Sequence, residues 1–310
     1  MKNKIKIINL NHSFIFFLIV NIFCILMLKL DLEISSILCL LLILTIGVSH
    51  GSLDHIKGKK LLELFNIQKT YLFYLIYIFI SFSIVLIWIM LPSITLMFFL
   101  IVASYHFGKE DTEFLITKKT FFTELLYLFK GVLIVLAPLT FHFQETVEIF
   151  KLLLIDNENF YLSLNFIETN NIIKIGIFLS FCSSIILLFK NFEIKKFTIF
   201  FDYFSILILN FYLTPLLAFT IYFCFLHSIR HSITLAMELN AVNLLTGFKI
   251  FVKKAIPLTI LTGVFCLISL YLLNLGNNLD SSVLKVIFIG LASLTFPHIL
   301  LEYLLEKNEK

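Results

Sequence analysis

Long apolar runs follow one another along almost the whole chain, and they constrain its fold more than any other feature. Of its 310 residues, 60% are hydrophobic, and the mean hydropathy is +1.01. Soluble domains contain roughly 45–50% apolar residues, whereas a membrane helix needs about 20 of them in succession. We therefore expect an all-α, polytopic transmembrane bundle of about 8–10 helices that forms a single integral membrane domain over residues 1–310.

The candidate helices are apolar runs bounded by charged residues or proline. Several neighbouring runs are separated by only a few residues, which indicates antiparallel helical hairpins. The two shortest runs are 93–107 and 198–213, and without them eight spans remain. The predicted helices cover residues 12–29, 32–50, 70–91, 93–107, 121–142, 172–189, 198–213, 216–236, 254–274 and 283–304.

The charge pattern predicts the orientation of this bundle. With the N-terminus in the cytoplasm, most of the 24 basic residues fall on the inner side, and the longest outer loop, 143–171, is mostly acidic. This distribution satisfies the positive-inside rule and indicates a multi-pass protein of the inner (cytoplasmic) membrane. Because the basic residues are spread over many short loops, the net charge of +4 does not indicate a nucleic-acid partner.

Eight histidines interrupt the apolar pattern, and five of them share one predicted depth. Counted at about 1.5 Å per residue along helices that run inwards, these five fall in the inner half of the membrane. Histidine is costly in lipid and usually faces a bundle interior, where it marks a site. The five are His50, His106, His227, His231 and His298, whereas His12 and His142 fall near helix ends, where interface roles are expected.

Several imidazoles at one depth suggest a metal site. His227 and His231 are four residues apart, so they share one helix face, a spacing that suits two ligands of one metal. Imidazole ligation alone leaves zinc, copper, iron and nickel open. Metal-bound histidine usually donates its second N–H to a carboxylate or carbonyl. We expect such outer positions for Asp54, His55, Glu110, Asp111 and His298.

Four phrases around these histidines resemble a known family. They are Gly-Val-Ser-His-Gly-Ser-Leu-Asp-His at 47–55, Tyr-His-Phe-Gly-Lys-Glu-Asp at 105–111, His-Ser-Ile-Arg-His at 227–231 and Pro-His at 297–298. In this order they resemble the Brp/Blh family of β-carotene 15,15′-dioxygenases over residues 47 to about 301, with Ser49 where that family usually has proline.

The resemblance implies an integral membrane enzyme that cleaves β-carotene at its central double bond with O2 to give two all-trans-retinal molecules. It also implies non-haem Fe(II) as the cofactor, and a functional link to a retinal-binding rhodopsin. The metal ligands carried over from the family are His50, His106, His227 and His231.

Three alternatives remain open at this stage. A fatty-acid desaturase or another membrane lipid oxidase would also use histidine-bound metal, but the chain has one HxxxH and no HxxHH box. A transporter could use buried histidines, yet the outer halves of the predicted spans offer few charges, chiefly Lys130 and Asp202. An opsin-like receptor would need a Schiff-base lysine such as Lys130, which leaves the clustered histidines unexplained.

Overall fold

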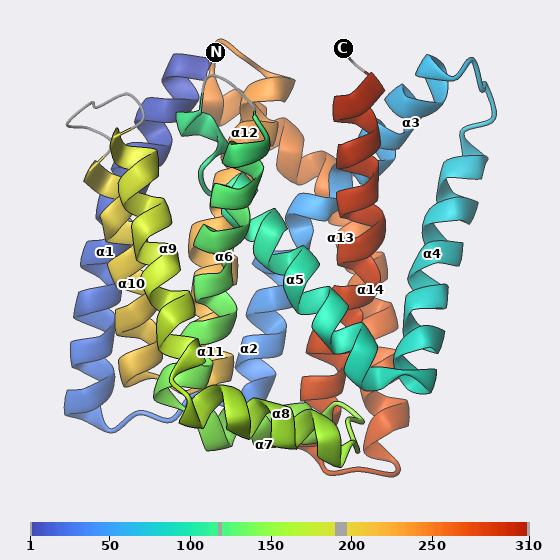
Figure 1. The fold of residues 1–310 in the computed structure, drawn as a ribbon. Helices are drawn as coiled ribbons and strands as arrows, with labels where there is room; N and C mark the ends of the chain where they lie inside the picture. The colour runs from blue at the N-terminus through green and yellow to red at the C-terminus, as the bar shows by residue number, and fades with distance from the viewer. Residues whose placement is uncertain (1, 117–119, 190–196, 309–310) are drawn as a thin grey trace.

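The computed structural model describes residues 2–116, 120–189 and 197–308, and the side chains of Lys2 and His50 fall outside this description. Every element in these ranges is helical, and the helices form one bundle (Figure 1). Both chain ends lie at the same end of the bundle (Figure 1), as expected for an even number of crossings. The predicted all-α helical bundle is therefore confirmed.

Seven helical segments of the described chain are long and apolar enough to cross a membrane, and an eighth is formed if a bent pair counts as one span. Six are single helices: α1 (Lys2–Leu30), α4 (Tyr71–Met90), α6 (Phe121–Phe141), α9 (Ile172–Phe189), α13 (Leu244–Asn274) and α14 (Leu279–Asn308). The seventh joins α11 (Pro215–Ile221), η5 (Tyr222–Ser228) and α12 (Ile229–Leu239). The bent pair joins α2 (Ser36–Leu42), η1 (Ile43–Gly47), η2 (Val48–Leu53) and α3 (Asp54–Leu64).

The two shortest predicted runs are also helices, α5 (Pro92–Glu110) and α10 (Ile199–Tyr212). Proline occupies the first turn of α5 and of α11, where its missing N–H and fixed φ are tolerated. Thr120 begins α6 with a reciprocal capping box to Thr123. Eight of the ten predicted runs thus correspond to one helix each, although α1 and α13 begin about ten residues earlier than the apolar pattern alone indicates. The runs 32–50 and 216–236 are each divided into several helical segments, and α3 was not predicted.

The segment 143–171, expected as a loop, contains two helices, α7 (Phe143–Leu152) and α8 (Glu158–Thr169). They lie across the end of the bundle opposite the chain termini (Figure 1). The side chain of Asn157 caps α8 by accepting from the N–H of Phe160 at 3.1 Å. Short helices with mixed polar and apolar residues escape a search for long apolar runs, which explains why the sequence pattern missed them.

Two of the histidine phrases stand where the helices depart from α geometry. η1 and η5 are π-helical, and η2 is a 3-10 segment; such irregular turns often occur at functional positions. The irregular segments contact each other, because the Ser228 hydroxyl donates to the carbonyl of Gly47 at 3.2 Å. A Cβ on Gly47 would crowd the ring of Phe223, so this close approach requires glycine.

α5 packs against α6 with almost no space between the two backbones. A Cβ built on Gly131 would collide with the carbonyl oxygen of Ser104, and one on Gly108 with the carbonyl oxygen of Tyr127. Small residues at membrane helix interfaces permit such approaches. This contact fixes the C-terminal half of α5, which carries His106, against the rest of the bundle.

We expect Gly131→Ala to destabilise the protein by about 1–3 kcal/mol, because the added methyl group forces two helix backbones apart. Gly263→Ala is the matched control, since a Cβ at Gly263 in α13 meets no atom within 4 Å. Thermal unfolding in detergent, followed by circular dichroism, compares the two variants. Equal melting temperatures would show that the α5–α6 contact tolerates a larger residue.

Candidate metal centre

Four histidine rings come together inside the bundle, one each from α5, η5, α12 and α14. The ring of His106 lies 5.2 Å from that of His227 and 5.4 Å from that of His298, centroid to centroid, and His298 lies 5.7 Å from His231. All four residues are buried. His50 belongs to η2, but its side chain lies outside the described residues.

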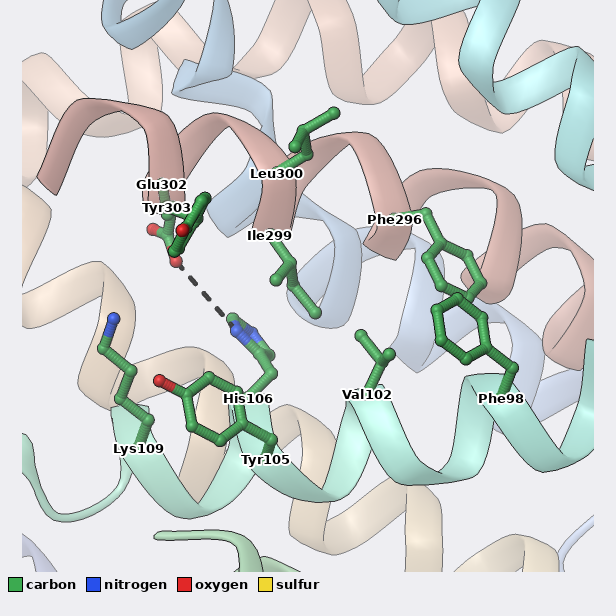
Figure 2. Close-up of a pocket in the computed structure, with 10 residues that line it drawn as sticks. All are labelled: Phe98, Val102, Tyr105, His106, Lys109, Phe296, Ile299, Leu300, Glu302 and Tyr303. Atoms are coloured by element: carbon green, nitrogen blue, oxygen red, sulfur yellow. Dashed lines mark ion pairs between the residues drawn. The ribbon is translucent and has the colours of Figure 1, made fainter. Parts of the chain in front are cut away.

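A carboxylate that the sequence reasoning missed lies among these rings. Glu302 follows His298 by one helical turn in α14, and its two oxygens lie 4.0 Å from His106 Nδ1 and 3.7 Å from His298 Nε2. One oxygen also lies 3.8 Å from His231 Nε2. Figure 2 shows Glu302 facing His106 across the space between α14 and α5. The four-residue spacing from His298 is the signal that could have identified Glu302.

The side chains form two overlapping groups of potential metal ligands. One consists of His106, His298 and Glu302, and the other of Glu110, His231 and Glu302; within each group the donor atoms lie within 4.8 Å of one another. Two imidazoles and one carboxylate are the donor set of many non-haem Fe(II) oxygenases. The residues present therefore fit an iron ion by the chemistry of their donors.

Carboxylates hold the outer nitrogens of three of these rings. His298 Nδ1 lies 2.9 Å from both oxygens of Asp54, and His231 Nδ1 lies 2.9 Å from Glu110. His227 Nδ1 lies 3.4 Å from Asp111. An ionised carboxylate only accepts hydrogen bonds, so the Nδ1–H groups of His231 and His298 donate to Glu110 and Asp54. In His231 and His298 the remaining nitrogen, Nε2, then faces Glu302 with its lone pair, as a metal ligand requires.

The carboxylate pairs cross between helices. Asp54 and Glu110 follow His50 and His106 by four residues in the chain, yet the rings they hold belong to His298 and His231. His55 is placed differently: its Nδ1 donates to the carbonyl of Ser52, at 2.9 Å, within its own turn. It belongs to neither of the two ligand groups found among the described residues.

Three further side chains hold the carboxylates in place. The hydroxyl of Tyr77 donates to Asp54 at 3.0 Å, and that of Tyr222 donates to Asp111 at 2.6 Å. The ammonium group of Lys57 donates to Glu302 at 2.8 Å. None of these contacts has a signal in the sequence, because each joins segments that are distant in the chain or lie on different helices.

Arg230 stands between the two histidines of α12 and η5 in the chain but contacts other partners. Its guanidinium group donates to Asp202 at 2.8 Å, to the hydroxyl of Ser13 at 2.5 Å and to the carbonyl of Asp111 at 3.3 Å. Arg230 and Asp202 are only 2% and 3% exposed, so the ion pair is fully buried. It ties α12 to α1, to α10 and to Asp111, the residue that follows α5.

A comparison with known protein families places the chain in one of them. The family model described as beta-carotene 15,15'-dioxygenase matches residues 41–306, a range that contains all four histidine phrases and Glu302. No curated protein and no solved structure matches the chain. Since the matched range covers most of the 310 residues, the chain belongs to the β-carotene 15,15′-dioxygenase family.

Proposed function

We propose that this protein is a membrane non-haem iron dioxygenase that cleaves β-carotene at its central double bond with O2. The bond between the two central carbons is broken, and each oxygen atom of O2 becomes the aldehyde oxygen of one all-trans-retinal. The observation that carries the proposal is the group formed by the buried His106 and His298 with the half-buried Glu302, within a membrane bundle of this family. Because β-carotene dissolves only in lipid, a site within the membrane is where enzyme and substrate meet.

The proposed iron ligands begin with His106, His298 and Glu302, since their donor atoms already converge. His50, His227 and His231 remain proposed ligands from the sequence. For His298, the sequence favours an outer role, whereas its Nε2 facing Glu302 supports direct ligation. When bound, Fe(II) supplies the activation of O2 that an organic side chain cannot provide.

The other residues of the site orient the ligands and exclude water. Asp54 and Glu110 fix the rings of His298 and His231 through Nδ1, which sets the tautomer and raises the basicity of the second nitrogen, and Asp111 lies beside Nδ1 of His227. Phe107 packs edge-on against His227 at 4.7 Å, and Phe223 stacks on it at 5.8 Å, both between ring centroids. These aromatic rings leave little room for water beside His227.

The proposed setting is the cytoplasmic membrane, with the N-terminus inside. The three lysines of α3, which lies at the end of the bundle that carries both termini (Figure 1), support this orientation. β-Carotene and O2 both concentrate in the hydrocarbon, and retinal released there would reach a retinal-binding rhodopsin in the same membrane. The buried ion pair of Arg230 with Asp202 gives Asp202 a structural role, which weakens the transporter alternative.

Expression in bacteria that make β-carotene tests the activity. We expect the orange colour to fade and retinal to accumulate, because the protein supplies both a membrane site and a ligand set for iron. Extracted pigments are identified by chromatography, with an empty vector as the control. Undiminished colour, with the protein present in the membrane and iron supplied, would contradict the proposal; products of unequal length would exclude central cleavage.

Iron analysis of purified protein tests the ligands. We expect a single iron ion per chain, and its loss in His106→Ala, His298→Ala and Glu302→Ala. His142→Ala is the control, because His142 precedes α7 and pairs with Glu145 there at 3.4 Å. Iron retained by His298→Ala but lost by His227→Ala would instead give His298 the outer role. Two irons per chain would favour a desaturase, and retinal bound to Lys130 without iron would favour an opsin.

Replacing a carboxylate that holds a histidine ring should weaken iron binding less than replacing a metal ligand. We expect Asp54→Asn and Glu110→Gln to weaken iron binding by about 10–100-fold, because a neutral amide is a poorer acceptor for the imidazole N–H. Activity should then recover at saturating iron. Competition with a chelator measures the affinity, and Glu148→Gln, an exposed residue paired with Lys151, is the control. Wild-type affinity in both variants would show that these hydrogen bonds do not support the metal.

A further inference from the structure

A pocket of about 230 Å³ lies between α5 and α14 and shares His106 and Glu302 with the candidate metal centre. Figure 2 shows these two side chains facing each other, while Phe98 and Phe296 meet further along the same two helices. The rings of Phe98 and Phe296 are stacked, with centroids 5.3 Å apart. Val102 and Ile299 line the pocket between the two ends. The pocket is therefore continuous with the proposed reaction centre.

The two ends of the pocket differ in polarity. Beyond His106 on α5, Lys109 forms an ion pair with Glu306 of α14 at 2.6 Å. In the other direction the lining is aliphatic and aromatic as far as the Phe98–Phe296 pair. The binding of an apolar chain beside His106 is thus favoured only on the side of the pocket that leads to Phe98 and Phe296.

The pocket opens towards the surface of the bundle that faces lipid. Phe98 is 57% exposed and Leu300 is 43% exposed, and both line it. Around membrane-spanning helices, exposed apolar side chains of this kind contact hydrocarbon. A molecule dissolved in the bilayer can reach the pocket sideways without passing through water.

The length of the apolar section matches one arm of the substrate. From His106 to Phe98 the helix rises by about 12 Å, at about 1.5 Å per residue. β-Carotene is about as long as the bilayer core is thick, roughly 30 Å, so each half measures about 15 Å. Pockets that enclose a whole drug-sized ligand usually exceed about 300 Å³, so a pocket of about 230 Å³ holds part of such a molecule.

We propose that the α5–α14 pocket admits β-carotene sideways from the bilayer and holds one polyene arm, with the ring end of that arm at the Phe98–Phe296 pair. This inference rests on the proposed function. The aromatic pair then fixes the distance between the ring end and the double bond that reaches His106 and Glu302. Phe98 and Phe296 are accordingly residues that determine which double bond is cleaved.

Obstruction of the pocket tests the proposal. Val102→Trp fills the apolar section of the pocket. Ile101→Trp is the matched control, because Ile101 is adjacent to Val102 in the chain but is 53% exposed and does not line the pocket. We expect Val102→Trp to weaken β-carotene binding to iron-free protein in nanodiscs by about tenfold or more. Retinal formation by the iron-loaded variant should fall in parallel, with iron content unchanged, while Ile101→Trp stays near wild type in all three measurements.

Equal binding and equal rates in the two tryptophan variants would overturn the proposal, even if the wild type makes retinal. If the wild type makes no retinal, the proposed function is refuted. The binding of β-carotene is measured on iron-free protein, so the test of the pocket does not depend on that outcome. Should Val102→Trp fail to assemble, Ile299→Trp obstructs the same space from α14.

The role of the aromatic pair has its own readout. The double variant Phe98→Ala/Phe296→Ala removes the end of the pocket, so we expect aldehydes of unequal length beside retinal. Phe79→Ala, at a position 71% exposed on α4, controls for loss of a lipid-facing ring. Retinal as the sole product of the double variant would show that the pair does not set the cleavage position.

Discussion

The pairing of three buried imidazoles with carboxylates from other segments of the chain is the interaction on which this structure depends. Asp54 with His298, Glu110 with His231, and Asp111 with His227 each join segments far apart in the chain. A carboxylate left without a partner in a medium of low dielectric constant costs several kcal/mol. The helices can therefore bring these groups inside only if they converge in one arrangement, and that arrangement is the proposed metal site.

The backbone supports this convergence by departing from regular geometry. The π-helical segments η1 and η5 touch through Ser228 and Gly47, while Gly108 and Gly131 allow α5 to approach α6. Arg230 adds a buried ion pair with Asp202 that holds α12 against α10. None of the residues in these contacts lines the α5–α14 pocket, so the proposed binding of substrate there would not disturb them.

The sequence predicts the helices well because hydrophobicity is a local property of the chain. It also places the histidines at one depth, since depth depends only on the rise along each helix. The contacts of Glu302, and the pairing of Asp54 and Glu110 with histidines of other helices, depend instead on how each helix is rotated about its axis. That rotation is set by packing between distant segments, and the irregular turns in η1 and η5 change it further. α7 and α8 escaped the prediction for another reason, namely that neither contains a long apolar run.

The candidate metal centre and the proposed substrate pocket share a single face of α5. Phe98, Val102 and His106 follow one another at intervals of four residues, so they lie along one stripe of the helix. On α14, Phe296, Ile299 and Glu302 follow at intervals of three and face this stripe (Figure 2). In the proposed complex, the distance from the ring end of the polyene to the proposed metal ligands is thus set by the rise of two helices rather than by a loop. A helix changes its length far less than a loop changes its shape, and this rigidity is what a choice between neighbouring, chemically similar double bonds requires.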